Sequence, residues 1–229
     1  MRRTVPNGQL PCRPVQVFTL VASLVALVAV LGNWWSRMSE HAVVELVTKP
    51  TATIAIALIG LSVASRHDVP SGAVVAAIIG FAFCLAGDVA LLPAVDKFIV
   101  GLAAFLLGHL AFVVMFIELG LPRWPLGLLA LAGTAVVAAV LGRRIIAGAR
   151  AQDASLVIPV CAYLTVISAM AVVGWATGAP AAIVGSALFV ASDSILGWGQ
   201  FVRERRWMPV AIMVTYHGAL LGLALSLGS

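Results

Sequence analysis

Residues 80–92 read GFAFCLAGDVALL, a stretch in which ten of thirteen side chains are apolar and one, Asp88, is a carboxylic acid. No lysine or arginine lies within eight residues of Asp88. An ionisable side chain inside a membrane span costs about 2.5–3.5 kcal/mol on insertion scales, so such residues usually have a function. Whether this stretch crosses a membrane therefore decides both the fold class and the role of Asp88.

The composition of the whole chain indicates an integral membrane protein. Of the 229 residues, 62% are hydrophobic and 10% are charged, and the mean hydropathy is +1.10. A soluble domain, by comparison, is about one quarter charged. Most arginines lie between apolar runs, as expected for loops that set membrane topology. Because no basic stripe with interleaved aromatic residues is present, we expect no nucleic-acid partner.

The apolar runs predict an all-α polytopic membrane bundle, because hydrocarbon cannot satisfy the free backbone groups of other structures. Eight spans are expected at about 15–32, 48–64, 71–92, 98–118, 124–142, 154–174, 180–198 and 208–228. They form one domain, residues 15–229, after an N-terminal tail of residues 1–14. Breaks are predicted at Gly-, Pro- and Arg-containing segments such as GRRIIAGARAQD, residues 142–153. Since the second run is short, seven spans are the alternative.

A second embedded acid, Asp193, is expected at the same depth as Asp88. Asp88 lies four residues before the end of the third span and Asp193 lies five before the end of the seventh. These spans cross in the same direction and rise about 1.5 Å per residue. Lys49 opens the second span, which crosses the opposite way, so it is expected near the same membrane face. Alternatively, Lys49 only extends toward water from a helix end, and the acids are structural.

Four further polar residues lie inside the spans: His109, His217, Tyr163 and Tyr216. The two histidines are expected nearer the midplane than the acids. Glycine and other small residues share a helical face with Asp88, and the same holds on the fourth, sixth and seventh spans. Because small residues let helices approach closely, these faces should point into the bundle. We therefore expect the polar groups to converge on one cavity.

The surroundings of the two acids are similar to each other. CLAGDVALL around Asp88 and FVASDSILG around Asp193 both place Ala, a small residue and Asp before a Leu three positions later. A histidine follows on the next span in each case: His109 after Asp88 and His217 after Asp193. A parallel repeat with four spans in each half is one explanation of this match.

Six motifs, in this order along the chain, resemble the lysoplasmalogenase (YhhN-like) family over residues 45–225. They are TKPTA at 48–52, GDVALL at 87–92, FLLGHLAF at 105–112, Tyr163 with Met170, GSALFVASDSIL at 185–196 and TYHGALL at 215–221. The resemblance implies an eight-span membrane hydrolase without a metal cofactor, whose substrate is a lysophospholipid of the bilayer. Its reaction would cleave the vinyl ether bond of lysoplasmalogens to a fatty aldehyde and a glycerophospho-base. The last motif departs from the family pattern. Where the family has a Tyr-Tyr pair followed by Gln, this chain has Tyr216 and His217, with Leu220 near the Gln position.

The family's functional residues match the embedded polar residues of this chain. Its two acids match Asp88 and Asp193, its Lys-Pro matches Lys49 and Pro50, and its Gly-His matches His109. A vinyl ether is hydrolysed by protonation of its β-carbon, and a carboxylic acid that apolar surroundings keep protonated supplies the proton. A second carboxylate then stabilises the cation and activates water, as in glycoside hydrolysis.

This chemistry suggests a role for each embedded residue. Asp88 would be the general acid and Asp193 the base or cation stabiliser, with the reverse assignment also open. His109 would orient one of the carboxyl groups. Lys49, with arginines of the same membrane face, would hold the substrate phosphate. The cavity would be shaped by Tyr163, Tyr216 and His217.

Two other functions remain open at this stage. Embedded Asp and His residues also serve as proton relays, so the main alternative is a proton-coupled transporter of lipids or small molecules. A metal-dependent lipid amidase would need several histidines at one depth, and only His109 and His217 lie within spans. For each of these functions, we expect a multi-pass protein of the plasma membrane.

Overall fold

The computed structural model describes residues 13–229, so the predicted tail, residues 1–14, lies almost wholly outside the described part. Within residues 13–229 the secondary structure is helical and contains no strand. Eight helical segments there are long and apolar enough to cross a membrane. The prediction of an all-α bundle with eight rather than seven spans is therefore confirmed.

The helices are α1 (Arg13–Ser39), α2 (Ala42–Ala64), α3 (Ser71–Ala90), α4 (Phe98–Leu119), α5 (Trp124–Val137), α6 (Arg143–Gln152), α7 (Val157–Ala176), α8 (Pro180–Phe201) and α9 (Met208–Leu225). A π-helical turn, Ala138–Gly142, joins α5 to α6, so these two form one continuous span. Short 3-10 turns occupy Ala154–Leu156, before α7, and Ser226–Gly228, after α9.

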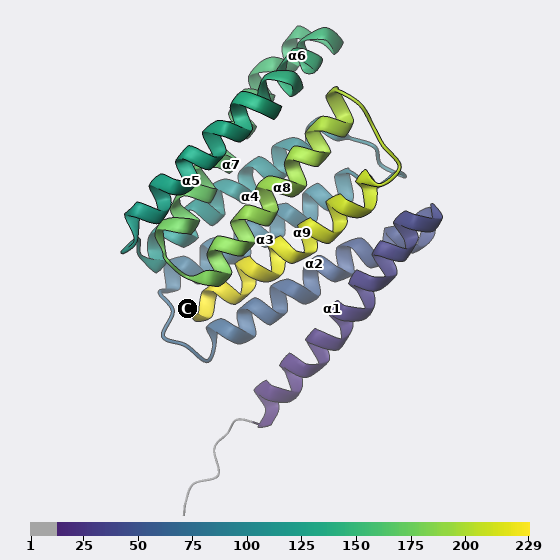
Figure 1. Cartoon of the computed structure of the whole chain (residues 1–229). Helices are drawn as coiled ribbons and strands as arrows, with labels where there is room; N and C mark the ends of the chain where they lie inside the picture. The colour runs from purple at the N-terminus through teal and green to yellow at the C-terminus, as the bar shows by residue number, and fades with distance from the viewer. Residues whose placement is uncertain (1–12) are drawn as a thin grey trace, which may run out of the picture.

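The predicted break at residues 142–153 is wrong, because the helix continues to Gln152. This segment is rich in Arg and Ala, which form helices well. Its apolar residues Ile145 and Ala149 are buried, while its three arginines are exposed. The helix α6 thus extends beyond the predicted span, and Figure 1 shows it at the far end of the α5 segment.

The first two helices are longer than expected, and this changes the position of Lys49. α1 continues to Ser39 and α2 begins at Ala42, whereas the predicted spans ended at 32 and began at 48. Polar residues indicated a loop here, but in the structure they bond to one another. Asn33 donates to Thr48, 3.4 Å between Nδ2 and Oγ1. Lys49 therefore lies in the third turn of α2 and does not open that helix.

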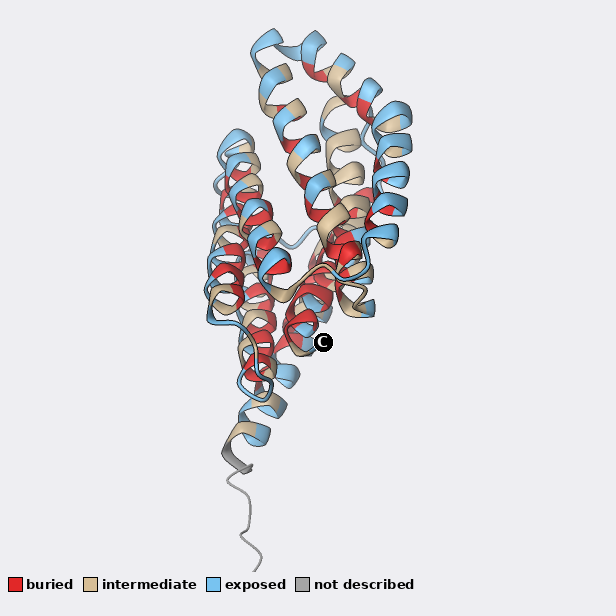
Figure 2. Cartoon of the chain, turned by 90° about the vertical axis from the view of Figure 1, so that its left-hand side faces the viewer, coloured by how far each residue is buried: buried red, intermediate tan, exposed pale blue. Residues whose placement is uncertain are grey.

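Six helices form a closed ring in the order α2, α3, α4, α7, α8, α9 and back to α2. Outside this ring, α1 packs on α2 and α9, and α5 packs on α7. Figure 1 shows α1 and α5 on opposite edges of the molecule. Buried residues lie on the faces that meet neighbouring helices, and exposed ones face outward (Figure 2). The outward faces are rich in large aliphatic residues such as Val28 and Ile158, as expected where lipid surrounds the bundle.

Small residues bring the ring helices close together. A Cβ atom on Gly185 of α8 would lie 2.9 Å from the backbone of Gly222 in α9, so neither position has room for a side chain. A Cβ atom on Gly60 of α2 would likewise lie 3.1 Å from the Cβ atom of Ala224 in α9. Such close approaches provide the van der Waals contact that holds helices together in lipid. The interior is then filled by Phe112, Phe116, Phe189, Met170 and Leu220.

The two halves of the chain share most of their neighbours, although α1 also contacts α9 and α5 has no comparable contact with α4. In the first half α1 packs on α2 and α3 on α4, and in the second α5 packs on α7 and α8 on α9. Across the halves, α2 contacts α9 and α7 contacts α4. This is the arrangement expected of a parallel repeat with four spans in each half.

Candidate functional site

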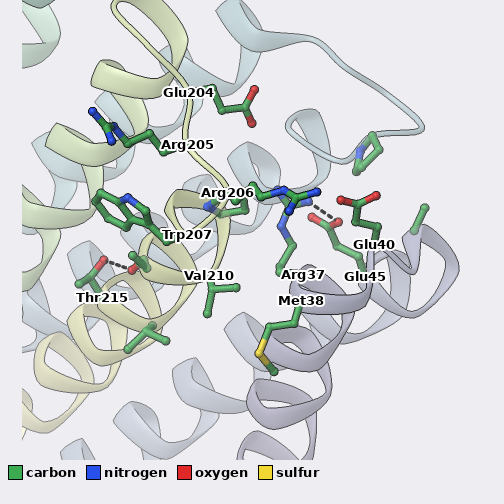
Figure 3. A pocket seen from close by; sticks show the side chains of 15 residues that line it. Arg37, Met38, Glu40, Glu45, Glu204, Arg205, Arg206, Trp207, Val210 and Thr215 are labelled. Carbon is green, nitrogen blue, oxygen red and sulfur yellow. Dashed lines mark hydrogen bonds and ion pairs between the residues drawn. The ribbon is translucent and has the colours of Figure 1, made fainter.

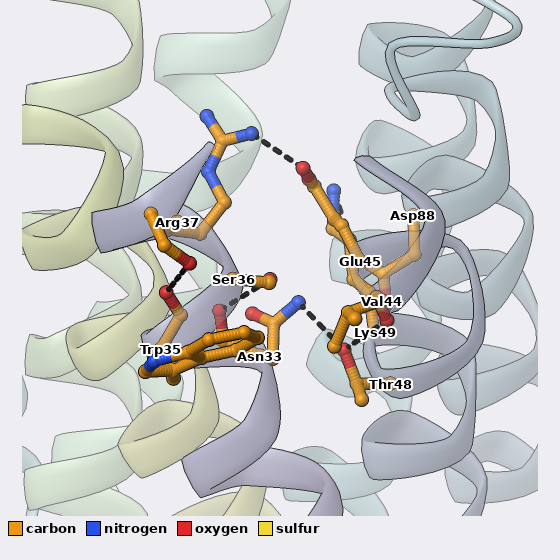
Figure 4. Close-up of polar contacts among 10 residues, drawn as sticks. Asn33, Trp35, Ser36, Arg37, Val44, Glu45, Thr48, Lys49 and Asp88 are labelled. Atoms are coloured by element: carbon orange, nitrogen blue, oxygen red, sulfur yellow. Dashed lines mark hydrogen bonds and ion pairs between the residues drawn. The ribbon is translucent and has the colours of Figure 1, made fainter. Parts of the chain in front are cut away.

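Asp88, in the last turn of α3, is fully buried and surrounded by donors. Its Oδ2 accepts hydrogen bonds from the Thr53 hydroxyl at 2.5 Å and from the Tyr216 hydroxyl at 2.8 Å. The Lys49 ammonium lies 3.7 Å from Oδ1. Figure 4 shows Lys49 beside Asp88. Because an unpaired buried charge is very costly, Lys49 and Asp88 balance each other in the interior of the ring.

Asp193, in α8, has a different set of neighbours. The Tyr163 hydroxyl donates to its Oδ2, and Nε2 of His109 lies 3.7 Å from the same oxygen, beyond hydrogen-bond distance. His109 is buried among rings, with its centroid 5.3 Å from that of Tyr163 and 4.5 Å from that of Phe189. Within the described residues, neither His109 nitrogen has a hydrogen-bond partner, and no Lys or Arg forms an ion pair with Asp193.

The two acids occupy matching places in the repeated architecture. Each lies on the third helix of its half and is approached by the second helix of the same half. The fourth helix of the other half completes both surroundings, with Tyr216 of α9 beside Asp88 and His109 of α4 beside Asp193. The spatial counterpart of His109 is therefore Tyr216, and not His217 as the order of residues along the chain suggested.

A small cavity brings the two acids together. It has a volume of about 100 Å³, and Asp88 and Asp193 both line it. Lys49, Phe105 and Tyr216 are also part of its wall. We call this space the inner cavity. A space of this size can hold water molecules beside the two acids.

Three of the predicted residues, His109, Tyr163 and His217, lie outside the wall of the inner cavity. His217 faces α1, where its Nδ1 accepts a hydrogen bond from Nε1 of Trp34 at 3.1 Å. It was expected to shape the cavity, but neighbouring residues on a helix point about 100° apart, and Tyr216 already faces Asp88. Tyr163 contacts Asp193 from the side and lines an apolar pocket with it instead.

Two residues near the acids were missed by the sequence analysis, Thr53 and Glu45, and Arg37 was expected only as one of several loop arginines on the same membrane face. Thr53 follows Lys49 by one helical turn, so the helical period could have identified it. Arg37 and Glu45 form an ion pair at 2.6 Å between α1 and α2 (Figure 4). The sequence analysis assigned Arg37 to a loop, and no motif links the two residues.

A larger cleft of about 1400 Å³ lies next to this ion pair, between the α1–α2 turn, the α8–α9 loop and the start of α9. We call it the outer cleft. Its charged and aromatic lining residues are Arg37, Glu40, Glu45, Glu204, Arg205, Arg206 and Trp207 (Figure 3). Arg37, Glu45 and Pro209 line both the outer cleft and the inner cavity. The inner cavity is thus separated from the outer cleft by only a few side chains.

Comparison with known proteins identifies the family. The sequence profile of the YhhN family matches residues 44–227. The human protein named "Lysoplasmalogenase TMEM86B" is 34% identical over 159 residues, which are 69% of this chain and 66% of that protein. Proteins named "Lysoplasmalogenase" from Mycobacterium bovis and Mycobacterium tuberculosis are each 32% identical over 124 residues, 53% of this chain and 48% of theirs. The matched region thus spans just under two thirds of the human relative and about half of the mycobacterial ones.

No solved structure gives a significant match. This integral, multi-pass membrane protein belongs to the YhhN family.

Proposed function

We propose that this protein hydrolyses the vinyl ether bond of lysoplasmalogen-like lysophospholipids, releasing a fatty aldehyde and a glycerophospho-base. The names of the relatives support this reaction. The observation that carries the proposal is that two acids, the fully buried Asp88 and the mostly buried Asp193, line one cavity inside the ring. A vinyl ether needs a proton donor at carbon and a base for water, and two acids in unlike surroundings supply both.

The charges around the acids support a division of labour between them. Asp88 accepts two hydrogen bonds and lies 3.7 Å from the Lys49 ammonium, an environment that suits a carboxylate. Asp193 accepts one hydrogen bond on Oδ2 and lies among rings, which suits a neutral acid with its proton on Oδ1. We therefore assign the acid to Asp193 and the base to Asp88, the reverse of the first assignment made from the sequence.

The reaction then proceeds in three steps. Asp193 donates its proton to the β-carbon of the vinyl ether, which leaves an oxocarbenium ion and the Asp193 carboxylate. Water adds to this cation while Asp88 accepts one proton of that water, which gives a hemiacetal. The hemiacetal collapses to the aldehyde and the glycerol hydroxyl, and proton exchange restores both acids. One water is consumed for each ether bond.

Other residues of the site act as positioning groups. Tyr216 and Thr53 fix Asp88 from two helices, and Tyr163 fixes Asp193. Locked rotamers of this kind keep reacting groups in place before the substrate arrives. Lys49 is 3% exposed. Its position beside Asp88 supports a role in balancing that charge rather than in binding the substrate phosphate.

The test is aldehyde release from a lysoplasmalogen by purified protein in detergent micelles, with the saturated ether analogue as control. We expect aldehyde from the vinyl ether only. A proton-coupled transporter would need sealed vesicles and would release no aldehyde in micelles, so the absence of product from folded protein would reject the proposed function.

A further inference from the structure

The outer cleft is connected to the acids by shared walls. Arg37, Glu45 and Pro209 line both the cleft and the inner cavity. On another part of its wall, the inner cavity shares Phe105, Leu196 and other residues with the apolar pocket beside Asp193. The three spaces are therefore adjacent: charged residues line both the outer cleft and the inner cavity, whereas the pocket beside Asp193 is almost wholly apolar. This order matches an amphiphile whose reacting bond lies between a polar and an apolar end.

The side chains of the outer cleft offer unpaired charges of both signs. Within residues 13–229, Arg37 is paired with Glu45, while Arg205, Arg206 and two glutamates of the cleft form no ion pair. The Nε atom of Arg37 is buried and has no hydrogen-bond partner in the described part of the chain. A donor left unpaired at the boundary of two cavities indicates an acceptor that the protein itself does not supply.

We propose that the outer cleft binds the phosphodiester head group of the substrate through Arg205, Arg206 and the free Nε–H of Arg37. This inference rests on the proposed function for the identity of the lipid. Arginine is suited to phosphate because its planar group donates two parallel hydrogen bonds. The Arg37–Glu45 pair, between cleft and inner cavity, then separates the phosphate from the acids.

The acidic residues of the cleft define the head group further. Its lining carries three arginines and three glutamates, which leaves no net charge to attract a bare phosphate dianion. Glu40 and Glu204, together with the indole of Trp207, are suitable partners for a cationic base. The cleft therefore fits a phosphodiester that carries an amine or quaternary ammonium group better than it fits a phosphomonoester.

The experiment measures binding and needs no turnover. A saturated 1-O-alkyl lysophosphocholine is titrated into the detergent-solubilised protein by calorimetry and compared with a 1-O-alkylglycerol of the same chain length. The double variant Arg205→Gln/Arg206→Gln should bind the phosphocholine about tenfold more weakly. Its affinity for the alkylglycerol should stay within about twofold. Arg203→Gln is the matched control, because Arg203 lies in the same loop but does not line the cleft.

Two outcomes would overturn the assignment. One is an equal loss of affinity for both ligands or an equal effect of Arg203→Gln, since either would indicate a general surface effect. The other is found by competition. We expect glycerophosphocholine to displace the analogue and inorganic phosphate at the same concentration not to do so. Better displacement by inorganic phosphate would overturn the assignment and identify a free-phosphate site. Since the analogue is not hydrolysed, these results are independent of whether the protein cleaves vinyl ethers.

Discussion

The surroundings of Asp88 and Asp193 are alike in architecture and different in charge. Each acid lies on the third helix of its half and accepts a hydrogen bond from a tyrosine. Beside Asp88, however, lies an ammonium group at 3.7 Å, whereas the corresponding approach to Asp193 comes from a phenol and an imidazole. Matching places in the two halves of the bundle thus hold two acids with different neighbours, and this difference is the basis of the different tasks that we propose for them.

The largest expected effect comes from removing either acid. Asp193→Asn and Asp88→Asn keep the shape of the side chain but remove the proton donor or the base. A general acid or base typically contributes about 10²–10⁴-fold, so aldehyde release should fall by that factor in each variant. The steady-state rate in micelles measures the loss, and size-exclusion chromatography verifies that the protein is folded. Near-normal rates in both variants would exclude the paired-acid mechanism.

The two variants should differ in stability, and this sharpens the comparison. Asp88→Asn leaves the buried Lys49 ammonium without its partner, so the free energy of unfolding should fall by about 3–5 kcal/mol. Asp193→Asn leaves no buried cation without a partner, so it should change the free energy of unfolding by no more than about 1 kcal/mol. Unfolding in mixed micelles measures both values.

The double variant Lys49→Met/Asp88→Asn is the control for this effect. It should recover most of the lost stability, because it removes the unpaired charge, and it should remain inactive. Equal destabilisation by the two single variants would contradict the charge difference between the acids.

The tyrosines provide a smaller contrast. Tyr216→Phe removes a hydrogen bond to a carboxylate, and bonds to charged groups contribute about 1.5–3 kcal/mol, so kcat should fall at least about tenfold. Tyr163→Phe removes a bond to a neutral acid, about 1 kcal/mol, so the fall should be about fivefold. Phenylalanine preserves the ring contacts in both cases. A larger loss in Tyr163→Phe would reverse the assignment of the ionised acid.

The smallest effect is expected at His217, which faces α1. His217→Gln weakens the bond from Trp34 and should lower the free energy of unfolding by about 1 kcal/mol, while kcat stays within about twofold. A loss as large as that of Tyr216→Phe would show that His217, and not only its neighbour, serves the acids.

The sequence predicted the fold class and the eight spans well, because hydropathy is a local signal. The roles of the two acids stay a prediction, although both line one cavity. The positions of Lys49 and of the α1–α2 turn could not be predicted, because Asn33, Arg37 and Glu45 are polar residues that indicate a loop, and their partners are known only from the tertiary structure. The orientation of His217 could have been inferred, since it cannot share a face with Tyr216. The outer cleft is lined by segments that lie far apart in the chain, and no motif in any of these segments indicates it.

The central claim is that the two acids carry different charges in the same bundle. Infrared spectroscopy at neutral pH measures this directly, because a protonated carboxyl group has a carbonyl band that a carboxylate lacks. We expect such a band in the wild-type protein and in Lys49→Met/Asp88→Asn, and its loss in Asp193→Asn. Loss of the band in Lys49→Met/Asp88→Asn, or its persistence in Asp193→Asn, would contradict this assignment of charges.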